Sequence, residues 1–348
     1  MPRKLVRGNT AVAEGAIHAG CRYYFGYPIT PQNDIPEYLA AELPKVGGTF
    51  IQAESEIASI NMMMGASAAG ARVMTSSSGP GISLMQEGLS YMAGSELPAV
   101  VVCISRIGPG LGGIAPTQGD YKQATRGGGH GDYRTVVLAP SSVQEMFDLT
   151  IKLFELTDKH RNPGVLLCDA ILGQMKEPAV IGERPQPVPQ EKPWALRGAK
   201  GREPNLIKSL FLGDGEMETH NWKLFEKYER MRREDVMYEE MFTDDAEFLV
   251  VSFGSCARMT QSAIWKARET GLKAGLLRPI TLYPFPGARL RELTERIKKV
   301  LTVEMNTGQM HDDVRLSVHG DVETFLHPRP GGGLPTPEEI AEKIRKCY

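Results

Sequence analysis

The sequence predicts an α/β protein with a doubly wound parallel sheet and a second, smaller α/β unit. Strand-like and helix-like segments alternate from the N-terminus, which is typical of a parallel sheet covered by helices. Runs such as Ala99–Ile104 are continuously apolar and β-branched, as expected of strands buried on both faces. The alternation resumes at Glu247 after a charged interruption. We therefore expect a first unit over 1–175, a linker with a charged helix over 176–245, and a second unit over 246–348.

Local signals place the elements of the first unit. Gly20 is a typical left-handed residue at a helix end. Pro36 has no N–H, so the next helix should begin near Asn33 and leave Thr30 in a loop. Ser142 with Glu145 has the pattern of a capping box. The expected helices cover Thr10–Ala19, Asn33–Leu43, a segment from Glu56, Ile82–Met92 and Val143–Asp158, and the strands Tyr23–Tyr27, Thr49–Gln52, Arg72–Thr75, Ala99–Ile104, Thr135–Leu138 and Gly164–Cys168.

The linker and second unit have signals of their own. Proline makes 183–193 an extended connection. His220–Met241 is expected as one helix, whose stripe of Trp222, Phe225, Tyr228 and Met231 packs on a neighbouring unit. Thr336 with Pro337 begins the last helix. The second unit is expected to contain strands Phe248–Phe253, Ala274–Leu277 and Val300–Glu304, and helices Arg258–Thr270, Ala288–Lys299 and Pro337–Lys346.

Composition excludes several classes of protein. A length of 348 residues suggests two domains, and 41% hydrophobic residues can fill both cores. The net charge of −2 provides no basic field for nucleic acid. No apolar run approaches the ~20 residues needed to cross a membrane, and no apolar signal region follows the basic N-terminus. We therefore expect a cytoplasmic chain without nucleic-acid or membrane partners.

The cysteines argue against metal centres on this chain. All five are scattered singly without a Cys-x-x-Cys motif, which disfavours a disulfide framework. The usual iron–sulfur clusters need four closely placed thiolates. No His, Cys or Glu spacing suggests zinc. We therefore expect no metal ligands here.

Three polar residues follow predicted strands or begin helices at one edge of the sheet, where open α/β sheets bind ligands. Glu56 begins an apolar, small-residue helix. Thr30 follows the first strand, and Arg106, which could grip a carboxylate in bidentate fashion, follows Ala99–Ile104. Each has a structural alternative: an acidic first turn that complements the helix dipole, a helix cap, and a surface arginine, respectively.

Four motifs together resemble a known family. They are Gly26-Tyr-Pro-Ile-Thr-Pro31, Gln52-Ala-Glu-Ser-Glu56, Ser78-Gly-Pro-Gly81 and Gly127-Gly-Gly-His-Gly-Asp-Tyr133. Glutamate at a helix start, followed by a strand running into Ser-Gly-Pro-Gly, resembles the pyrimidine-binding domain of thiamine-diphosphate enzymes. In order, the motifs resemble the α subunit of 2-oxoacid:ferredoxin oxidoreductases, first the branched-chain 2-oxoisovalerate enzymes and second the 2-oxoglutarate enzymes. The second unit resembles a transketolase C-terminal-like domain.

The resemblance implies roles for individual residues. It implies that Glu56 hydrogen-bonds the cofactor's aminopyrimidine ring, that Thr30 faces the thiazolium ring and that Arg106 holds the substrate carboxylate. Glu54 competes for the first role. The cofactor-binding residues it implies are Tyr27, Pro28, Ile29, Thr30, Glu56, Ser78, Gly79 and Gly81. The long loop 108–134 adds further substrate-binding candidates, because long loops without elements of their own are often functional: Gln118, Asp120 and His130.

The resemblance also implies cofactors and partners. Gly213-Asp214-Gly215 lacks the asparagine of the magnesium-diphosphate motif at the required distance, so we expect it to be a turn. A β subunit is then expected to supply the diphosphate and Mg²⁺ site. The family also implies a γ subunit, a ferredoxin-like δ subunit with 4Fe–4S clusters, ferredoxin, and coenzyme A as substrate. The expected reaction is oxidative decarboxylation of a 2-oxoacid to acyl-CoA and CO₂.

Two other classes of function are weighed against this one. Non-redox thiamine enzymes commonly keep the diphosphate motif on the same chain, and this chain lacks it. A non-catalytic dinucleotide-binding or assembly protein would need a Gly-x-Gly-x-x-Gly turn after a strand to bind a dinucleotide, and none follows the first strand.

Overall fold

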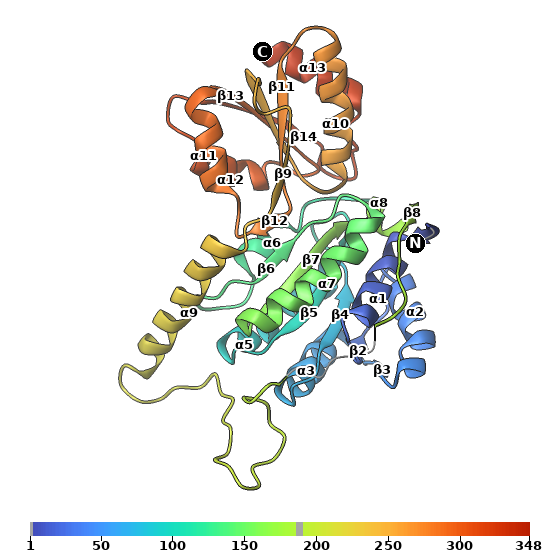
Figure 1. Cartoon of the computed structure of the whole chain (residues 1–348), viewed down its shortest axis with the longest axis vertical. Coiled ribbons are helices and arrows are strands. Elements are labelled where there is room, and N and C mark those ends of the chain that lie inside the picture. The colour runs from blue at the N-terminus through green and yellow to red at the C-terminus, as the bar shows by residue number, and fades with distance from the viewer. Residues whose placement is uncertain (1–2, 186–190) are drawn as a thin grey trace.

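A computed structural model describes residues 3–185 and 191–348 as two α/β units stacked along the long axis of the molecule (Figure 1). The larger unit is built on a seven-stranded sheet of order β12-β6-β7-β5-β4-β2-β3. Its strands are parallel except for β12, which runs antiparallel to β6. The smaller unit has a five-stranded sheet of order β14-β13-β10-β11-β9, in which only β9 is antiparallel. These sheets confirm the predicted fold class.

The strands and helices that the sequence predicts for the larger unit are present in order, together with elements that it did not predict at Lys4–Arg7, Tyr121–Arg126, Ala170–Gln174 and Lys176–Ala179. They are β1 (Lys4–Arg7), α1 (Gly8–His18), β2 (Tyr23–Gly26), α2 (Asp34–Glu42), β3 (Thr49–Gln52), α3 (Glu56–Ala68), β4 (Val73–Ser77), α4 (Gly79–Leu84), α5 (Gln86–Gly94), β5 (Ala99–Ser105), α6 (Tyr121–Arg126), β6 (Val136–Leu138), α7 (Val143–His160), β7 (Pro163–Asp169), α8 (Ala170–Gln174) and β8 (Lys176–Ala179). As predicted, α2 begins after Asn33, which leaves Thr30 in a loop.

The remaining elements follow the linker. They are α9 (Glu216–Glu234), β9 (Tyr238–Met241), β10 (Phe248–Ser252), α10 (Gly254–Glu269), β11 (Ala274–Pro279), β12 (Thr281–Tyr283), α11 (Gly287–Arg296), β13 (Lys299–Glu304), α12 (Gln309–Ser317), β14 (Glu323–Pro328) and α13 (Pro337–Cys347). Strand β12 returns to the larger sheet, which joins the two units by backbone pairing. The division at residue 246 remains a prediction.

The expected helix His220–Met241 was wrong at its C-terminal end. Helix α9 stops at Glu234, and Tyr238–Met241 forms β9 against β11. Of the four residues in the predicted stripe, Tyr228 and Met231 are buried, whereas Trp222 and Phe225 are exposed. The helix Ile82–Met92 is divided into α4 and α5. Residues 186–190 of the proline-rich stretch 183–193 lie outside the described residues.

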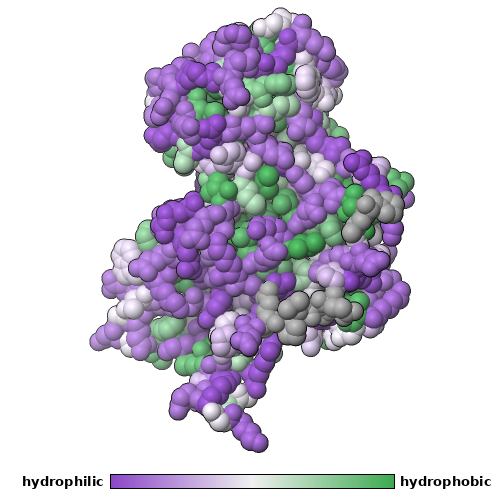
Figure 2. All heavy atoms as spheres, viewed as in Figure 1, coloured by the Kyte–Doolittle hydropathy of each residue, from purple (hydrophilic) through white to green (hydrophobic). Residues whose placement is uncertain are grey.

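Hydrophobic clusters cover both faces of both sheets. One packs α1, α2 and α7 on one face of the larger sheet, and another packs α10 and α13 on the smaller sheet. A third begins under α3, α4 and α5 and continues into the smaller unit through Phe253 and Leu282. Figure 2 shows apolar side chains at the waist between the units. The shared core indicates that the smaller unit is fixed firmly on the larger one.

A buried ion cluster reinforces this junction. Arg278, fully buried on β11, donates to both carboxylate oxygens of Glu145 on α7, at 2.6 and 3.0 Å, and to Glu239 on β9 at 2.9 Å. A buried charge that loses its partner is costly, so breaking such a cluster destabilises strongly.

We expect Arg278→Ala to lower the free energy of unfolding by about 1.5–3 kcal/mol, because it removes the charge-assisted hydrogen bonds of a fully buried guanidinium group to Glu145 and to the exposed Glu239. Lys152→Ala, which removes the exposed α7 ion pair with Glu155, is the control and should cost at most about 0.5 kcal/mol. Urea unfolding of both variants measures the difference. Equal, small changes would contradict the role of the cluster.

Candidate functional site

The candidate site lies at the carboxyl edge of three adjacent strands. Strands β2, β4 and β5 are neighbours in the larger sheet, and their ends lead to Thr30, to Ser77–Gly81 and to Arg106. Open α/β sheets bind ligands at this edge. The fold therefore brings together three of the motifs that the sequence singled out.

Glu56 occupies the first turn of α3 and is only 5% exposed. The side chain of Ser55 caps this helix by accepting a hydrogen bond from the N–H of Ala58 at 3.2 Å. Ser77 at the end of β4 donates to Glu56 Oε1 at 3.4 Å. Since a buried carboxyl group needs partners, the site is organised around this one.

The Ser-Gly-Pro-Gly turn leaves room for the Glu56 carboxyl group. A Cβ atom on Gly81 would lie 2.3 Å from Glu56 Oε1 and 2.1 Å from Ser77 Oγ, so any side chain there would displace one of them. The hydroxyl of Ser78, the residue before α4, is buried without a hydrogen-bond partner. Such an orphaned polar group is rare in folded proteins and suits a site that receives a polar ligand.

The other predicted cofactor-binding residues lie around this centre. Glu54, the competitor of Glu56, is exposed, as are Tyr27 and Pro28, whereas Ile29 is half-buried. The carbonyl group of Tyr27 accepts from Gln32 Nε2 at 3.3 Å. The two glutamates of this motif therefore differ in burial, since Glu56 is buried and Glu54 is exposed.

Arg106 is half-buried and reaches the Thr30 loop. Its Nη1 donates to the carbonyl oxygen of Thr30 at 3.1 Å and its Nη2 to that of Leu111 at 3.5 Å. Its Nε is buried without a partner. Within the described residues no acidic side chain forms an ion pair with Arg106. The guanidinium group therefore keeps a positive charge that no protein carboxylate neutralises.

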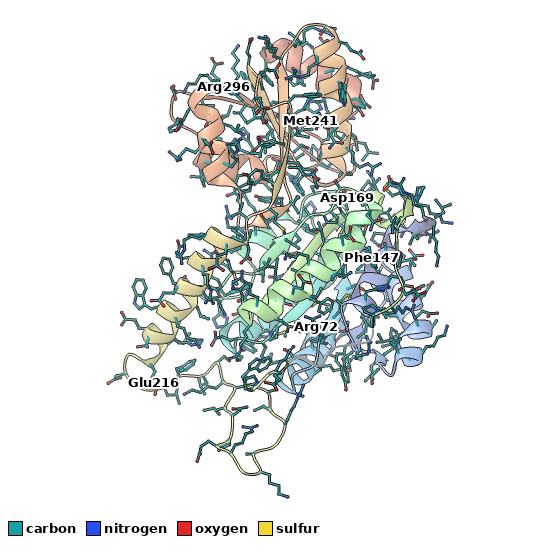
Figure 3. All side chains as sticks on the ribbon, viewed as in Figure 1. Arg72, Phe147, Asp169, Glu216, Met241 and Arg296 are labelled. Carbon is teal, nitrogen blue, oxygen red and sulfur yellow. The ribbon has the colours of Figure 1, made fainter. Side chains whose placement is uncertain are left out.

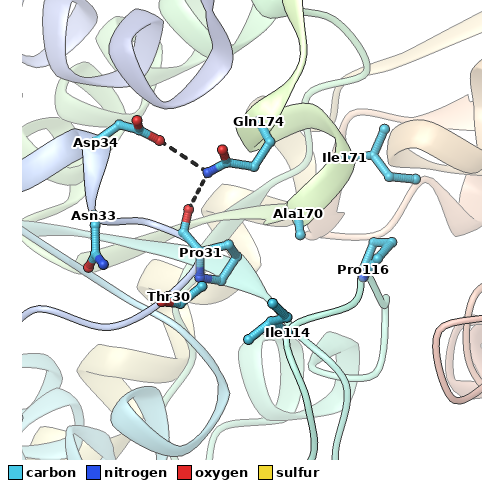
Figure 4. Close-up of a pocket in the computed structure, with 9 residues that line it drawn as sticks. All are labelled: Thr30, Pro31, Asn33, Asp34, Ile114, Pro116, Ala170, Ile171 and Gln174. Carbon is cyan, nitrogen blue, oxygen red and sulfur yellow. Dashed lines mark hydrogen bonds between the residues drawn. The ribbon is translucent and has the colours of Figure 1, made fainter.

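A pocket of about 490 Å³ adjoins Thr30 (Figure 4). Its wall is largely apolar and comes from the Thr30 loop, the loop after Arg106, and α8. Gln174 Nε2 donates to the carbonyl oxygen of Pro31 at 2.6 Å and to Asp34 at 3.1 Å. The pocket is lined by Thr30, Pro31, Asn33, Asp34, Ile114, Pro116, Ala170, Ile171 and Gln174.

Asp34 is the acidic group at this pocket. Burial alone would raise its pKa, but hydrogen bonds from Asn9, Arg7 and Gln174 outweigh burial and hold the pKa below its ordinary value. Asp34 is therefore a stable carboxylate near neutral pH.

Asp169 fixes the wall that α8 contributes. It lies at the junction of the two units (Figure 3), and burial raises the pKa of its carboxyl group. One oxygen accepts from Ile171 and Leu172 at the start of α8, at 3.0 and 3.2 Å, and the other accepts from Ser255 on α10 at 3.3 Å. Sequence reasoning missed α8, although the carboxyl-edge rule applied to the strand Gly164–Cys168 could have found it.

None of the three candidates in the long loop lines this pocket. Gln118 was predicted to bind substrate, but it is buried with both ends of its amide bonded to backbone groups of the smaller unit, so the structure corrects this expectation. His130 is exposed, and its ring lies edge-on to Tyr91 of α5 at 6.3 Å, away from the lining of the Thr30 pocket.

Asp120 is partly buried beside the end of β5. Cys103 Sγ donates to its Oδ2 at 3.6 Å. Burial raises the pKa of Asp120, against the opposing hydrogen bonds from Ser105 and Cys103. Asp120 thus contacts Cys103 and Ser105 near the end of the strand that leads to Arg106, but it does not line the Thr30 pocket.

Within residues 3–185 and 191–348, no cluster of three or more His, Cys, Asp or Glu side chains is arranged to hold a metal ion. Over the same ranges, no helix combines the length and apolarity needed to cross a membrane.

Comparison with known proteins defines the class of this chain. Residues 14–240 match the family model described as pyruvate flavodoxin/ferredoxin oxidoreductase, thiamine diphosphate-binding, and residues 246–340 match pyruvate:ferredoxin oxidoreductase core domain II. The chain belongs to this family of oxidoreductases, which confirms the prediction of a 2-oxoacid:ferredoxin oxidoreductase subunit.

Two curated relatives are similar over nearly their whole length, and this chain covers about two thirds of a related chain of known structure. Ketoisovalerate oxidoreductase subunit VorB of Methanothermobacter thermautotrophicus is 52% identical, over 99% of this chain and 98% of the relative. The 2-oxoglutarate synthase subunit KorA of Methanocaldococcus jannaschii is 39% identical, over 99% and 100%. The structure of 2-oxoglutarate:ferredoxin oxidoreductase from Magnetococcus marinus, solved with 2-oxoglutarate, coenzyme A and succinyl-CoA, matches with a TM-score of 0.89 at 29% identity, over 99% of this chain and 65% of that chain.

Proposed function

We propose that this chain is the subunit that carries Glu56, Thr30 and Arg106 in a CoA-dependent, branched-chain 2-oxoacid:ferredoxin oxidoreductase. The observation that carries the proposal is the convergence of these residues at one sheet edge, with Glu56 buried against Gly81. Thiamine diphosphate, when bound, supplies the carbon nucleophile for the keto group and takes up the electrons left when CO₂ departs. In the proposed reaction, coenzyme A would accept the acyl group, and iron–sulfur clusters on partner subunits would carry the electrons to ferredoxin.

The residues present fit the pyrimidine side of that cofactor. Glu56 can hydrogen-bond a ring nitrogen, since its carboxyl group is buried and, among the protein groups described, accepts a hydrogen bond only from Ser77. Ser78 offers an unpartnered hydroxyl, and Gly79 and Gly81 bring backbone close without side chains. The Gly213-Asp214-Gly215 segment is a turn before α9, as predicted, so the diphosphate and Mg²⁺ are assigned to a β subunit.

An exposed apolar face supports a partner beside the site. Helix α3 has no charged residue after Glu56, yet it exposes Ile57 and Met62. Leu84 on α4 and Leu111 in the loop after Arg106 are also exposed, Leu111 at 81%. Helices that are apolar all round are usually buried, and apolar patches of this kind mark interaction surfaces. We assign the face to the β subunit, with γ and δ subunits completing the complex.

The pocket beside Thr30 favours a branched-chain substrate over 2-oxoglutarate. Arg106 is available for the carboxylate next to the keto group. The lining of the pocket holds no Lys, Arg or His, and Asp34 there would repel a second carboxylate. Three cations of the long loop could serve a dicarboxylate, but none of them lines the pocket: Lys122 pairs with Asp312, Arg126 pairs with Asp313, and Arg134 donates to the carbonyl oxygen of Tyr133. An unpaired buried charge is costly, so an apolar acyl chain fits better.

We therefore expect 2-oxoisovalerate to exceed 2-oxoglutarate in kcat/KM. Purified complex would be assayed with a panel of 2-oxoacids, coenzyme A and a viologen dye as electron acceptor. Related branched acids should also react, because one methylene in an apolar pocket changes kcat/KM only about 10–200-fold. A wide preference for 2-oxoglutarate would contradict the substrate proposal, and a complex without iron or without CoA dependence would contradict the reaction.

A further inference from the structure

The loop that carries Arg106 is closed on itself. Arg106 forms an antiparallel bridge with Pro116, and the N–H of Ile107 donates to the carbonyl of Ala115 at 3.0 Å. Residues 106–116, here the Arg106 loop, therefore form one hairpin-like body. The position of this loop depends on the contacts at its two ends.

One end is continuous with β5, and the other is bonded to the smaller unit. Directly after Pro116, Thr117 Oγ1 and the N–H of Gln118 both donate to the carbonyl oxygen of Met305, at 3.0 and 3.1 Å. Asn306 Nδ2 donates to the carbonyl oxygen of Gln118 at 2.9 Å. These contacts lie at the end of β13, so the smaller sheet determines the position of the Arg106 loop.

The side chain of Gln118 is the centre of this contact. It is 3% exposed, its Nε2 donates to the carbonyl oxygen of Phe253 at 2.8 Å, and its Oε1 accepts from the N–H of Met305 at 3.0 Å. A Cβ atom on Gly254 would lie 2.9 Å from that Nε2, so the glycine makes room for the amide. Neither hydrogen-bonding end is left for a ligand.

We infer that the smaller unit positions Arg106 for the substrate carboxylate, with Gln118 as the positioning residue that transmits the register of β10 and β13 to the Arg106 loop. The chain of contacts runs from Phe253 and Met305 through Gln118 to the Pro116 bridge, and from Arg106 to the Thr30 carbonyl group. The smaller unit thereby has a part in substrate binding as well as in assembly. This inference rests on the proposed role of Arg106.

A double-mutant cycle in the purified complex tests it. Gln118→Ala should raise the KM for 2-oxoisovalerate and lower kcat/KM by up to about 10²-fold, because small misplacements of a binding group have such effects. The KM for coenzyme A should not change. In Arg106→Ala, the further change Gln118→Ala should alter kcat/KM by less than about a factor of two, since a residue that acts through Arg106 has nothing left to position.

Lys122→Ala is the matched control. It removes an exposed ion pair between α6, which follows the Arg106 loop in sequence, and Asp312 of the smaller unit, and it should leave both KM values unchanged. If Gln118→Ala does not assemble, Thr117→Val replaces it in the cycle; this change removes the hydroxyl that donates to Met305 and accepts from the N–H of Gly119.

The outcomes separate the two proposals. Additive effects of Gln118→Ala and Arg106→Ala, or equal changes in both KM values, would overturn the positioning role while leaving that of Arg106 intact. An Arg106→Ala complex with unchanged kinetics would overturn the role of Arg106, and that result is visible in the single variant alone.

Discussion

Replacing Glu56 by glutamine is expected to leave the complex assembled and to lower its turnover by about 10²–10⁴-fold, the usual worth of a proton-transfer group. Glutamine has the length of glutamate and can still accept from Ser77, so the buried space beside Gly81 stays filled. Its amide cannot take up and return a proton as a carboxyl group does. The loss should therefore appear in kcat, measured in the viologen assay with saturating 2-oxoacid and coenzyme A.

Glu54→Gln is the matched control for this experiment. Glu54 lies two residues away in the same motif but is exposed, whereas Glu56 is buried. We expect the Glu54 variant to keep nearly full turnover. The opposite ranking of the two variants would move the role to Glu54. Bound thiamine diphosphate, measured in each complex, gives a readout that does not depend on activity.

Gly81→Ala is expected to lower turnover by a similar factor of about 10²–10⁴, because it displaces the same carboxyl group. The added Cβ would lie well inside contact distance of Glu56 Oε1 and Ser77 Oγ, at 2.3 and 2.1 Å. The backbone of Gly81 is not in the left-handed region, so the effect comes from lost space and not from conformational strain. Turnover and thiamine diphosphate content of the complex measure it.

Gly65→Ala provides the control. Gly65 lies inside α3, and a Cβ atom there meets no atom within 4 Å. Alanine is favoured over glycine in a helix interior, so this variant should be stabilised by about 0.5–1 kcal/mol in thermal unfolding of the isolated chain. If both glycine variants kept full turnover, the close contact between Gly81 and the Glu56 carboxyl group would not be needed for catalysis.

The sequence was a good guide wherever structure depends on local pattern. The continuous apolar run at Ala99 identified β5, and the missing N–H of Pro36 placed the start of α2 after Asn33. Because both residues follow predicted parallel strands, Thr30 and Arg106 could be placed at the same carboxyl edge of the sheet without any knowledge of side-chain contacts. These inferences hold because each depends on a few neighbouring residues.

Contacts between distant segments were beyond the local pattern. Tyr238–Met241 continues the charged pattern of α9, yet pairing with β11 makes it a strand. Gln118 looked like a free polar residue in a long loop, and only the partners 135 and 187 residues away show that it is buried. The pocket wall from α8 depends in the same way on Asp169 joining two units.

The most direct test is a structure of the purified complex with thiamine diphosphate bound. We predict that the cofactor lies between this chain and a second subunit, with the Glu56 carboxyl group within about 3 Å of a pyrimidine ring nitrogen, the distance of a hydrogen bond. The diphosphate and its metal ion should be held by the partner. A pyrimidine ring held by Glu54 or by the partner subunit, with Glu56 still buried against Ser77 and Gly81, would contradict it.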